Sequence, residues 1–430
     1  MKIAMVGGSG YVGLCTGVGL AGKGHVVVCI DQDQAKVAML QAGKSPLYEP
    51  GLEAALKAAI GQGRLTATSD IDKGVAGCQA IFITVGTPSN ADGSIDLSYI
   101  KAASAQIGAA VRGRKDYFVV IVKSTVVPET TEKVVRPALE QASGKVAGKG
   151  FGLVMNPEFL REGKALDDFL MPDRIVIGSL DQRSGDVAEQ IYHNFQAPKL
   201  RTDLKTAEMI KYAGNAMLAT KISFINEIGN ICKLLGIDAY KVAEGIGLDK
   251  RIGPHFLNSG IGWGGSCFPK DVAALVAKAK EIGYEPRLLD EVTALNARQK
   301  VRILDMLERR MGSVKGKRIA VLGLAFKNDT DDIRDAPSIE IIGALKKAGA
   351  TIAAYDPQAM GNMRKLHPDI TYAKSVTAAL EAADACLVLT EWKEFAALGN
   401  RDFAAMRSRI ILEGRRVLAD SISGREGVCW

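Results

Sequence analysis

The sequence lacks the features that mark several classes of protein. No apolar run reaches about 18 residues without a polar interruption, so we expect no membrane-spanning helix. Met1–Val6 runs directly into a glycine-rich turn and lacks the charged-then-apolar pattern of a signal peptide. The seven cysteines include no CxxC pair, and an odd number without regular spacing is typical of reduced thiols. We therefore expect a cytoplasmic protein.

A strong excess of one charge is also missing. The 55 basic and 48 acidic residues give a net charge of +7, and no dense basic block is present. This balance fits an anionic small substrate, or ordinary solubility, better than a nucleic-acid surface. The four histidines have no metal-ligand spacing, and no acidic cluster resembles a cation site. We therefore expect no metal, no nucleic acid and no membrane as a partner.

What is present is the composition of a globular enzyme, with 47% hydrophobic residues. A chain of 430 residues is too long for one ordinary domain. Residues 1–200 alternate short β-branched runs with alanine-rich stretches, which predicts a parallel sheet with helices on both faces. The expected strands are Ile3–Val6, Val26–Ile30, Ala80–Val85, Phe118–Lys123, Gly152–Met155 and Arg174–Ile177.

Residues 201–300 have almost no strand pattern. Leu204–Leu235 has apolar residues at helical spacing and is followed by Gly236, which predicts one long helix. A further helix is expected over Asp271–Ile282, ending before Gly283. We interpret this segment as a central helical domain that joins two sheet domains and provides a surface for dimer formation.

Residues 301–430 return to the first pattern. Arg318–Gly323 is similar to Lys2–Gly7. Ala350–Asp356 is similar to His25–Asp31, so the two ends form a weak internal repeat. The turn Gly323–Lys327 lacks the second and third glycines, so we expect this copy to bind something other than a dinucleotide pyrophosphate in the usual way. The predicted fold is α/β, with two Rossmann-like doubly wound parallel-sheet domains joined by a long central helix and a helical middle domain.

A dinucleotide-binding pattern follows the first expected strand. Gly8-Ser9-Gly10-Tyr11-Val12-Gly13 opens the expected helix Leu14–Lys23. Bare glycines let the backbone approach a pyrophosphate, whose charge is favoured at a helix N-terminus. Asp31 ends the second strand, 18 positions beyond Gly13, where a carboxylate accepts hydrogen bonds from ribose hydroxyls and repels a 2′-phosphate. The pattern therefore predicts NAD as the cofactor.

Two further strand ends carry hydroxyl groups. Thr84–Pro88 ends one strand at a position where this fold collects ligands, although a plain Gly-Pro turn is an equal interpretation. Ser124 and Thr125 follow the strand that ends at Lys123.

The segment Gly262–Asp271 carries the most specific chemical pattern. Cys267 lies in a glycine-rich loop just before a helix, whose N-terminus favours a thiolate. Lys270 adds positive charge nearby, and Asp271 can cap the helix or act as an acid or base beside the sulfur. We interpret Cys267 as a reactive thiol, against the alternative of an inert cysteine.

Two other pairs of polar residues have helical spacing. Lys211 and Asn215 share one face of the long helix, where a cation and an amide can hold an oxyanion or form a solvated stripe. Glu158 and Glu162 lie in Asn156–Gly163, after a strand, and one of them could activate water for hydrolysis. Acidic pairs with this spacing also commonly decorate a surface.

Taken together, these motifs resemble the UDP-glucose/GDP-mannose dehydrogenase family over essentially the whole chain. In the family pattern, Gly264–Asp271 is closest to the UDP-glucose enzymes, because GDP-mannose enzymes usually have leucine after the cysteine. Ser266 argues against the dehydrogenases of N-acetylated sugars, which tend to have histidine there. The matching segments are Gly8–Gly13 with Asp31, Val85–Pro88, Ser124-Thr125, Asn156–Gly163, Lys211 with Asn215, Gly264–Asp271, and Phe326-Lys327 followed by Asp331–Arg334.

The resemblance implies a four-electron oxidation of UDP-glucose to UDP-glucuronate with two NAD in succession. Cys267 would form a thiohemiacetal and then a thioester, so that the aldehyde stays anchored during cofactor exchange. Asp271 and a water held by Thr125 would handle protons. Lys211 and Asn215 would stabilise the oxyanion, and hydrolysis would depend on the catalytic carboxylate Glu158.

The resemblance also assigns binding residues and an assembly. Arg251 is similar to an arginine that reaches the substrate of a neighbouring subunit, which implies a homodimer or higher homo-oligomer. The implied NAD-binding residues are Gly8, Gly10, Tyr11, Val12, Gly13, Asp31, Lys36, Thr87, Thr125, Glu162, Lys270 and Arg334. The implied substrate-binding residues are Phe159, Leu160, Arg161, Glu162, Lys211, Arg251, Phe256, Leu257, Asn258, Ser259, Gly260, Gly264, Phe326, Lys327 and Arg415.

One departure and three alternatives accompany this resemblance. The family usually has Gly-x-Gly directly after the first strand, whereas Gly7–Gly10 here contains one extra residue and predicts a longer turn. GDP-mannose oxidation with the same mechanism is the nearest alternative. A one-step dehydrogenase of the hydroxyacid type would not need Cys267, and a non-catalytic redox sensor would leave Lys211 and Glu158 without a role.

Overall fold

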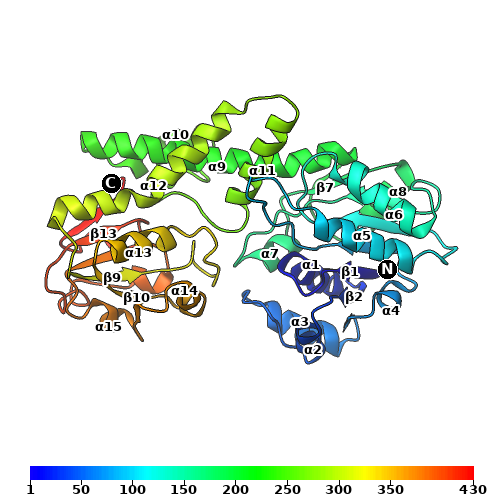
Figure 1. The fold of residues 1–430 in the computed structure, drawn as a ribbon, viewed down its shortest axis with the longest axis horizontal. Coiled ribbons are helices and arrows are strands. Elements are labelled where there is room, and N and C mark those ends of the chain that lie inside the picture. The colour runs from blue at the N-terminus through cyan, green and yellow to red at the C-terminus, as the bar shows by residue number, and fades with distance from the viewer. The chain divides into compact units, whose positions relative to one another are not determined.

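The computed structural model describes residues 1–430, which divide into two compact units, Met1–Gly214 and Asn215–Trp430. Each unit contains one sheet with helices on both of its faces (Figure 1). The predicted α/β fold with two doubly wound sheets is confirmed. The division into residues 1–200, 201–300 and 301–430 stays a prediction, and its boundary at 300 lies inside helix α12 (Arg287–Met311).

The first unit has an eight-stranded sheet. Its central strands pair in parallel, whereas β6 and β7 are antiparallel, which the sequence did not predict. The order across the sheet is β3 (Leu65–Thr68), β2 (Val26–Ile30), β1 (Lys2–Val6), β4 (Ala80–Ile83), β5 (Val119–Val122), β6 (Gly152–Met155), β7 (Ile175–Ser179) and β8 (Lys199–Thr202). The chain order reverses between β1 and β4, which is where doubly wound folds bind ligands.

Alternate residues of β1 enter two separate cores. Ile3 and Met5 pack on one face of the sheet with apolar side chains of α1, α2, α3, α7 and α8, while Ala4 and Val6 pack on the other with α4, α5, α6 and the start of α9. Burial on both faces explains the continuous apolar runs in the sequence. The helices are α1 (Tyr11–Gly22), α2 (Gln34–Gln41), α3 (Leu52–Gly61), α4 (Ile71–Val75), α5 (Ser98–Ala110), the π-helix η1 (Thr131–Val135), α6 (Arg136–Ser143), α7 (Ala165–Leu170), α8 (Gln182–Ile191) and the first part of α9 (Leu204–Leu235), whose remainder belongs to the second unit.

The second unit has a six-stranded sheet whose pairs are all parallel. Its order is β11 (Thr371–Tyr372), β10 (Thr351–Tyr355), β9 (Arg318–Leu322), β12 (Ala385–Val388), β13 (Ile411–Glu413) and β14 (Arg425–Gly427). The predicted internal repeat is therefore structural, because β9 and β10 occupy the same places as β1 and β2. The helices besides α12 are α10 (Ala239–Gly247), α11 (Phe268–Glu281), α13 (Pro337–Lys347), α14 (Met360–Leu366), α15 (Val376–Leu380) and α16 (Lys393–Ala396).

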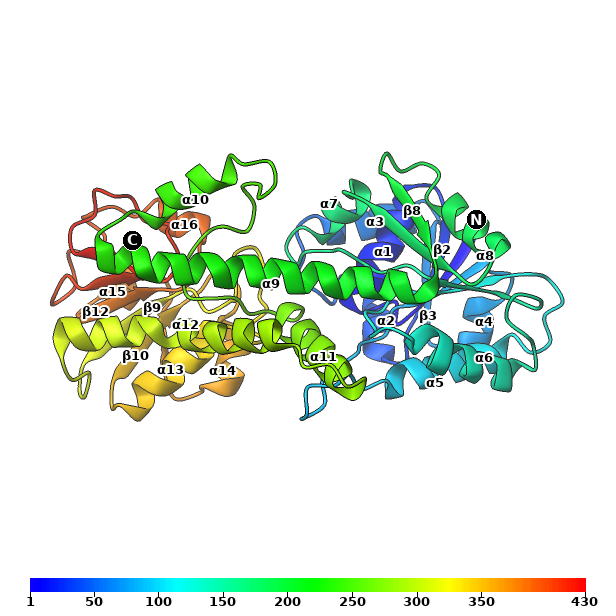
Figure 2. The same cartoon turned by 90° about the horizontal axis from the view of Figure 1, so that it is seen from above.

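The predicted long helix is present as α9, with the predicted bounds, and is unbroken (Figure 2). Helix α11 begins at Phe268 rather than at Asp271, because Pro269 occupies the first turn, where a missing N–H costs nothing. No helix of the chain is both long and apolar enough to cross a membrane. No group of three or more His, Cys, Asp or Glu side chains is placed to hold a metal ion.

Candidate functional site

The glycine-rich turn joins β1 to α1 by close backbone contacts. A Cβ atom on Gly13 would lie 2.4 Å from the Gly7 carbonyl oxygen and 2.6 Å from Thr84 Oγ1. One on Gly8 would lie 2.7 Å from the Met5 carbonyl oxygen, whereas one on Gly10 would meet nothing closer than 3.3 Å. Gly8 and Gly13 therefore let the helix approach the sheet, while Gly10 keeps the start of α1 uncovered.

Four residues, Gly7–Gly10, join the end of β1 to the start of α1, and the extra length relative to the family pattern stays a prediction. The N–H groups of Gly7 and Gly8 both donate to the Ile30 carbonyl oxygen, at 2.9 and 3.0 Å. Gly7 has a φ of +84°, a left-handed conformation that favours glycine. Gly10 is the N-cap of α1 and provides no side-chain cap, so backbone N–H groups of the first turn remain available to an anion.

Asp31 faces this turn from the end of β2. Its carboxylate accepts hydrogen bonds from the N–H and the hydroxyl of Ser9 and from the Asp33 N–H. Lys36 is half-exposed and lies 3.7 Å from Asp33 Oδ2. These residues fit a dinucleotide: the glycines leave room for a pyrophosphate at the helix start, no acidic residue occupies the first turn of α1, and a carboxylate lies beside the turn.

The strand ends next to this turn are tied together by hydroxyl groups. Thr84 Oγ1 donates to the Val6 carbonyl oxygen at 2.8 Å. Thr87 Oγ1 donates to the Thr125 carbonyl oxygen at 2.9 Å. Ser124 Oγ donates to the carbonyl oxygen at position 85, at 2.7 Å. The structure thus brings Thr87 and Thr125 together at the carboxyl ends of β4 and β5, adjacent to the point where the strand order reverses.

Glu158 and Lys211 form an ion pair inside the first unit. Glu158 Oε1 lies 2.9 Å from Lys211 Nζ, and both side chains are about 5% exposed or less. Glu158 Oε2 accepts the Leu160 N–H at 2.5 Å. Burial acts to raise the pKa of Glu158, but the charge and hydrogen bond of Lys211 outweigh it and hold the pKa below its usual range. Glu158 is therefore an ionised buried carboxylate.

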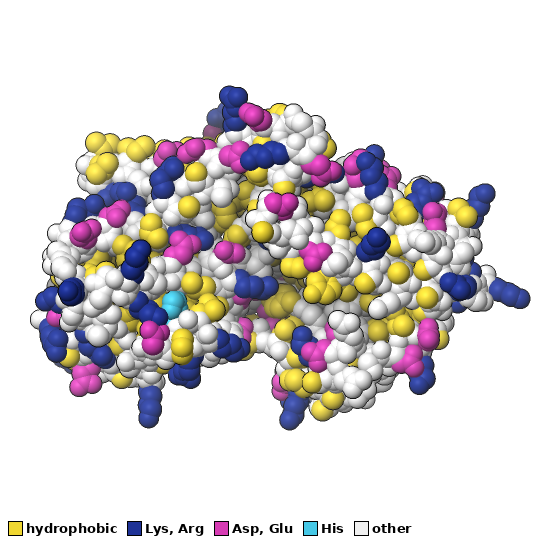
Figure 3. Space-filling model, in the orientation of Figure 1, with side chains coloured by type: hydrophobic (Ala, Val, Ile, Leu, Met, Phe, Trp, Pro, Cys, Tyr) yellow, Lys and Arg dark blue, Asp and Glu magenta, His cyan; other side chains and the backbone are white.

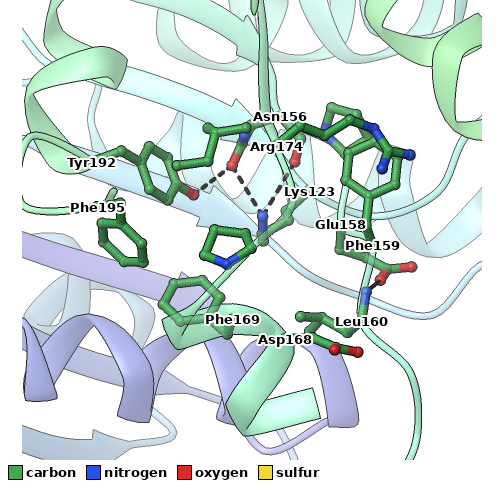
Figure 4. Close-up of a pocket in the computed structure, with 13 residues that line it drawn as sticks. Lys123, Asn156, Glu158, Phe159, Leu160, Asp168, Phe169, Arg174, Tyr192 and Phe195 are labelled. Atoms are coloured by element: carbon green, nitrogen blue, oxygen red, sulfur yellow. Dashed lines mark hydrogen bonds between the residues drawn. The ribbon is translucent and has the colours of Figure 1, made fainter. Parts of the chain in front are cut away.

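A second buried lysine, which the sequence patterns did not assign to the site, lies beside this pair. Lys123 Nζ donates to Asn156 Oδ1 at 3.0 Å, and Tyr192 donates to the same oxygen at 2.6 Å (Figure 4). The three side chains and Glu158 line a cavity of about 40 Å³. Burial lowers the pKa of Lys123 to about 8. The only signal in the sequence is a lysine that ends an otherwise apolar strand.

Other predicted residues of this segment have partners of their own. Phe159 packs under the guanidinium of Arg174, 3.9 Å from the ring centroid. Arg161 forms a two-pronged pair with Asp168 and is more than half exposed. Glu162 is half-buried.

In the second unit, Cys267 is the N-cap of α11 and is partly exposed. The other six cysteines are buried. The Sγ atom of Cys267 lies 3.6 Å from Ser266 Oγ, and the Cys267 carbonyl oxygen accepts the Asp271 N–H at 2.8 Å. N–H groups of a helix start stabilise a nearby anion, which suits a thiolate nucleophile.

Asp271 is buried in the first turn of α11. Asn215 Nδ2 donates to Asp271 Oδ2 at 2.6 Å, and Lys270 Nζ lies 2.5 Å from Asp271 Oδ1. The alternative that Asp271 caps the helix is wrong, because Cys267 holds that position. The structure thus brings Cys267, Lys270, Asp271 and Asn215 together.

The loop before Cys267 packs against the segment after β9. Gly265 has a φ of +86°, and a Cβ atom there would lie 2.7 Å from the Phe326 ring. A Cβ atom on Gly264 would lie 2.2 Å from the Asp335 carbonyl oxygen. Arg334 accepts the Gly265 N–H at its carbonyl oxygen, while its guanidinium pairs with Asp332. Lys327 Nζ lies 5.6 Å from the Phe326 ring centroid.

The segment that contains Phe256, Leu257, Asn258, Ser259 and Gly260 approaches Arg415. A Cβ atom on Gly260 would lie 2.9 Å from Arg415 Nη1, and Arg415 Nη2 donates to the Gly262 carbonyl oxygen. Phe256 has a φ of +63°, which is strained for a side chain of this size. Arg251 differs from these residues, because its side chain is 89% exposed and pairs with Asp249.

The second glycine turn differs from the first, as the sequence predicts. Asp356, which corresponds to Asp31, is fully buried and accepts N–H groups of Leu324, Ala325, Gln358 and Ala359 and the Trp392 indole N–H. With its oxygens engaged by the protein, this carboxylate supports the turn itself.

Comparisons with known proteins agree with this geometry. Three models of the UDP-glucose/GDP-mannose dehydrogenase family match the chain: the NAD binding domain over residues 1–196, the central domain over 205–298 and the UDP binding domain over 320–420. The chain is 48% identical to the UDP-glucose 6-dehydrogenase AglM of Haloferax volcanii, covering 100% of this chain and 99% of that one. It is 45% identical to the UDP-glucose 6-dehydrogenase TuaD of Bacillus subtilis, covering 97% and 90%.

A solved structure is similar over the same length. The UDP-glucose dehydrogenase of the hyperthermophilic archaeon Pyrobaculum islandicum superposes with a TM-score of 0.95 at 41% identity, covering 100% of this chain and 98% of that one. The chain therefore belongs to the UDP-glucose/GDP-mannose dehydrogenase family and is an NAD-dependent oxidoreductase.

Proposed function

We propose that the chain oxidises UDP-glucose to UDP-glucuronate in two successive steps through a covalent intermediate on Cys267. The observation that carries the proposal is the partly exposed Cys267 at the start of α11, beside the buried Asp271 and its partners Asn215 and Lys270. A thiol in that place can be deprotonated and can hold an aldehyde between two oxidations. Relatives named as UDP-glucose 6-dehydrogenases support the choice of sugar.

The cofactor is held by the turn Gly8–Gly13, Asp31 and the hydroxyl-bearing loops at Thr87 and Thr125. Bound NAD supplies the hydride acceptor for both oxidations. The Asp31 carboxylate accepts hydrogen bonds in the place where a 2′-phosphate would be repelled, which favours NAD over NADP. Tyr11, Val12, Lys36, Glu162, Lys270 and Arg334 complete the proposed NAD-binding set.

The chemistry at the sugar uses five side chains. Asp271 accepts the proton of the C6 hydroxyl, through a water that Thr125 holds, and the C6 hydride would pass to the bound cofactor, which leaves an aldehyde at C6. Sγ of Cys267 then adds to the aldehyde carbon, and the carbonyl oxygen becomes an oxyanion. Lys211 and Asn215 donate to this oxygen. Oxidation of the thiohemiacetal gives a thioester at Sγ.

Hydrolysis returns the enzyme to its starting state. Glu158 accepts a proton from water, the hydroxide oxygen bonds to the thioester carbon, and the carbon–sulfur bond breaks. The carboxylate leaves and Cys267 regains its thiol. Each oxygen of Glu158 already accepts one hydrogen bond, and a carboxylate oxygen has a second lone pair for water.

The diphosphate of the substrate requires positively charged donors. Arginine and lysine are suited to a diphosphate, and Arg415, Lys327 and Arg251 are the proposed donors. The remaining proposed substrate contacts are Phe159, Leu160, Arg161, Glu162, Phe256, Leu257, Asn258, Ser259, Gly260, Gly264 and Phe326.

We also propose that the chain forms a homodimer or a higher homo-oligomer in the cytoplasm. Met217, Phe224 and Ile231 recur every seven residues on one side of α9 and are 60%, 50% and 49% exposed. Hydrophobic atoms are uncovered at the end of α9, at the upper left of Figure 3, where Leu234 is also exposed. A second copy of the same helix would bury this stripe. The free thiol that the mechanism needs is compatible with the reducing cytoplasm.

An NADH assay on three sugar nucleotides tests the function. The purified chain should release two NADH for each UDP-glucose consumed, with much slower turnover of GDP-mannose and UDP-N-acetylmannosamine. One NADH per sugar would reject the thioester route, and preferential turnover of GDP-mannose would replace the substrate.

A further inference from the structure

A buried glutamate links the cofactor turn to the segment that carries the proposed substrate residues. Glu49 is 6% exposed and lies between α2 and α3. Its Oε2 atom accepts the Tyr11 hydroxyl and, at 2.7 Å, the Gly163 N–H. Its Oε1 atom accepts the Ala165 N–H at 2.7 Å. We call these four residues, Tyr11, Glu49, Gly163 and Ala165, the Glu49 brace.

The brace provides a hydrogen-bond acceptor for the start of α7 that the residues next to this helix do not provide. Helix α7 begins at Ala165, and its N-cap Lys164 makes no side-chain cap. A helix start leaves N–H groups without partners, and here Glu49 accepts the first of them, the Ala165 N–H, from 116 residues away along the chain. Gly163 has a φ of +79°, so the backbone turns sharply at the point where Glu49 holds it.

Tyr11 connects the brace to the cofactor turn. It is the first residue of α1 and lies within the glycine turn, so a dinucleotide bound there contacts the same residue whose hydroxyl holds Glu49. Burial and the hydrogen bond to Glu49 raise the pKa of Tyr11 far above its usual range, so the hydroxyl stays a donor. An ordinary helix cap would need no such link to the cofactor turn.

A packing contact makes the link stiff. A Cβ atom on Gly19 of α1 would lie 2.2 Å from the ring of Phe169 of α7, so the two helices touch where glycine allows it. They lie side by side in Figures 1 and 2. Helix α7 is thus fixed to α1 at Phe169, and its start is fixed to Tyr11 through Glu49.

We propose that Glu49 is a positioning residue that couples cofactor binding to sugar-nucleotide binding. The proposal rests on the proposed function and deepens it. A cofactor that settles on the turn fixes Tyr11, the brace then fixes the backbone of Gly163, and residues 158–162 are held ready for the substrate. By reciprocity the sugar nucleotide tightens the cofactor by the same factor. The link matters to a reaction that must exchange its cofactor while the sugar remains attached.

Calorimetric titration of UDP-glucose with and without saturating NADH tests the proposal. This pair does not react, because both partners are already reduced. For the wild-type protein we expect NADH to tighten UDP-glucose by roughly fivefold or more, within the usual range of coupling. In Glu49→Gln and in Tyr11→Phe the factor should fall to within about twofold of one. Tyr48→Phe, which removes a hydroxyl from an exposed neighbour, should keep the wild-type factor.

Three outcomes separate the interpretations. No binding of UDP-glucose to the wild type rejects the proposed function itself. Binding without any effect of NADH, or an unchanged coupling factor in Tyr11→Phe, overturns the role of the brace and leaves the function standing. If Glu49→Gln fails to fold, Tyr11→Phe decides alone, because it removes one hydroxyl and leaves Glu49 bonded to Gly163 and Ala165.

Discussion

Replacing Lys211 with methionine removes one partner of the buried pair with Glu158 and keeps most of the side-chain volume. Both groups are about 5% exposed or less, so the carboxylate would remain in the interior without its ammonium. Breaking a buried pair in this way costs about 3–5 kcal/mol. The positive charge of Lys123 lies nearby and partly compensates the buried negative charge of Glu158. We therefore expect a loss of about 3 kcal/mol in the free energy of unfolding of the first unit.

The assay must report on the correct unit. All three tryptophans, Trp263, Trp392 and Trp430, lie in the second unit, so their fluorescence does not follow the first. Amide hydrogen exchange of β5 and β6, followed by mass spectrometry, measures opening of the buried central strands. A loss of about 3 kcal/mol corresponds to a roughly hundredfold larger opening equilibrium constant, and so to roughly hundredfold faster amide exchange.

The stability difference between wild type and Lys211→Met should depend on pH in one direction. The pKa of Glu158 is depressed in the folded chain, so the pair stabilises above the unfolded pKa of about 4.3. This contribution is lost as the pH falls through the lower folded-state pKa. The difference between wild type and Lys211→Met should therefore shrink below about pH 4. Lys241→Met, which removes an exposed partner of Glu244, is the matched control and should exchange as the wild type does. An equal effect of both variants, or a difference that is constant with pH, would refute the reasoning.

Three further predictions follow from single contacts. Gly13→Ala places a Cβ atom 2.4 Å from the Gly7 carbonyl oxygen and should cost about 2 kcal/mol and weaken NADH binding, as measured by fluorescence titration; unchanged affinity would contradict the tight turn. Asp31→Asn should weaken NADH about tenfold and reduce its preference over NADPH, whereas an unchanged preference would remove Asp31 from the ribose site. Burial raises the pKa of Glu208 to about 7, so unfolding free energy should fall as pH rises from about 4.3 to 7, and Glu208→Gln should lose that slope in amide exchange of the η1 segment.

The parts of the fold that the sequence predicts are those governed by local pattern. Strands β1, β2 and β4 are predictable because they are buried along most of their length and so read as apolar runs. Helix α9 is predictable because its apolar residues recur at helical spacing. In the first sheet, the two strands that the sequence analysis missed, β3 and β8, lie at the edges. Edge strands need little apolar content, and Leu65–Thr68 and Lys199–Thr202 have little.

The site follows the same rule. Motif residues such as Cys267 and Asp31 are recognisable because their spacing to glycines and helix starts is fixed by chemistry close in the chain. Lys123 and Glu49 are not, since their partners come from distant segments: Glu49 and Gly163 are 114 positions apart in the chain. The antiparallel β6–β7 pair is missed for the same reason. These contacts join residues that are far apart in the chain, and no local sequence pattern predicts them.

The central claim, a sugar carbon bound to sulfur, can be measured directly. Glu158→Gln should slow hydrolysis, so after mixing with UDP-glucose and NAD the peptide that contains Cys267 should carry the added mass of a UDP-glucuronyl thioester. The same peptide from Cys267→Ser should carry none, and that variant should not release UDP-glucuronate. NADH formation by Glu158→Gln without any adduct on Cys267, or complete turnover by Cys267→Ser, would contradict the account.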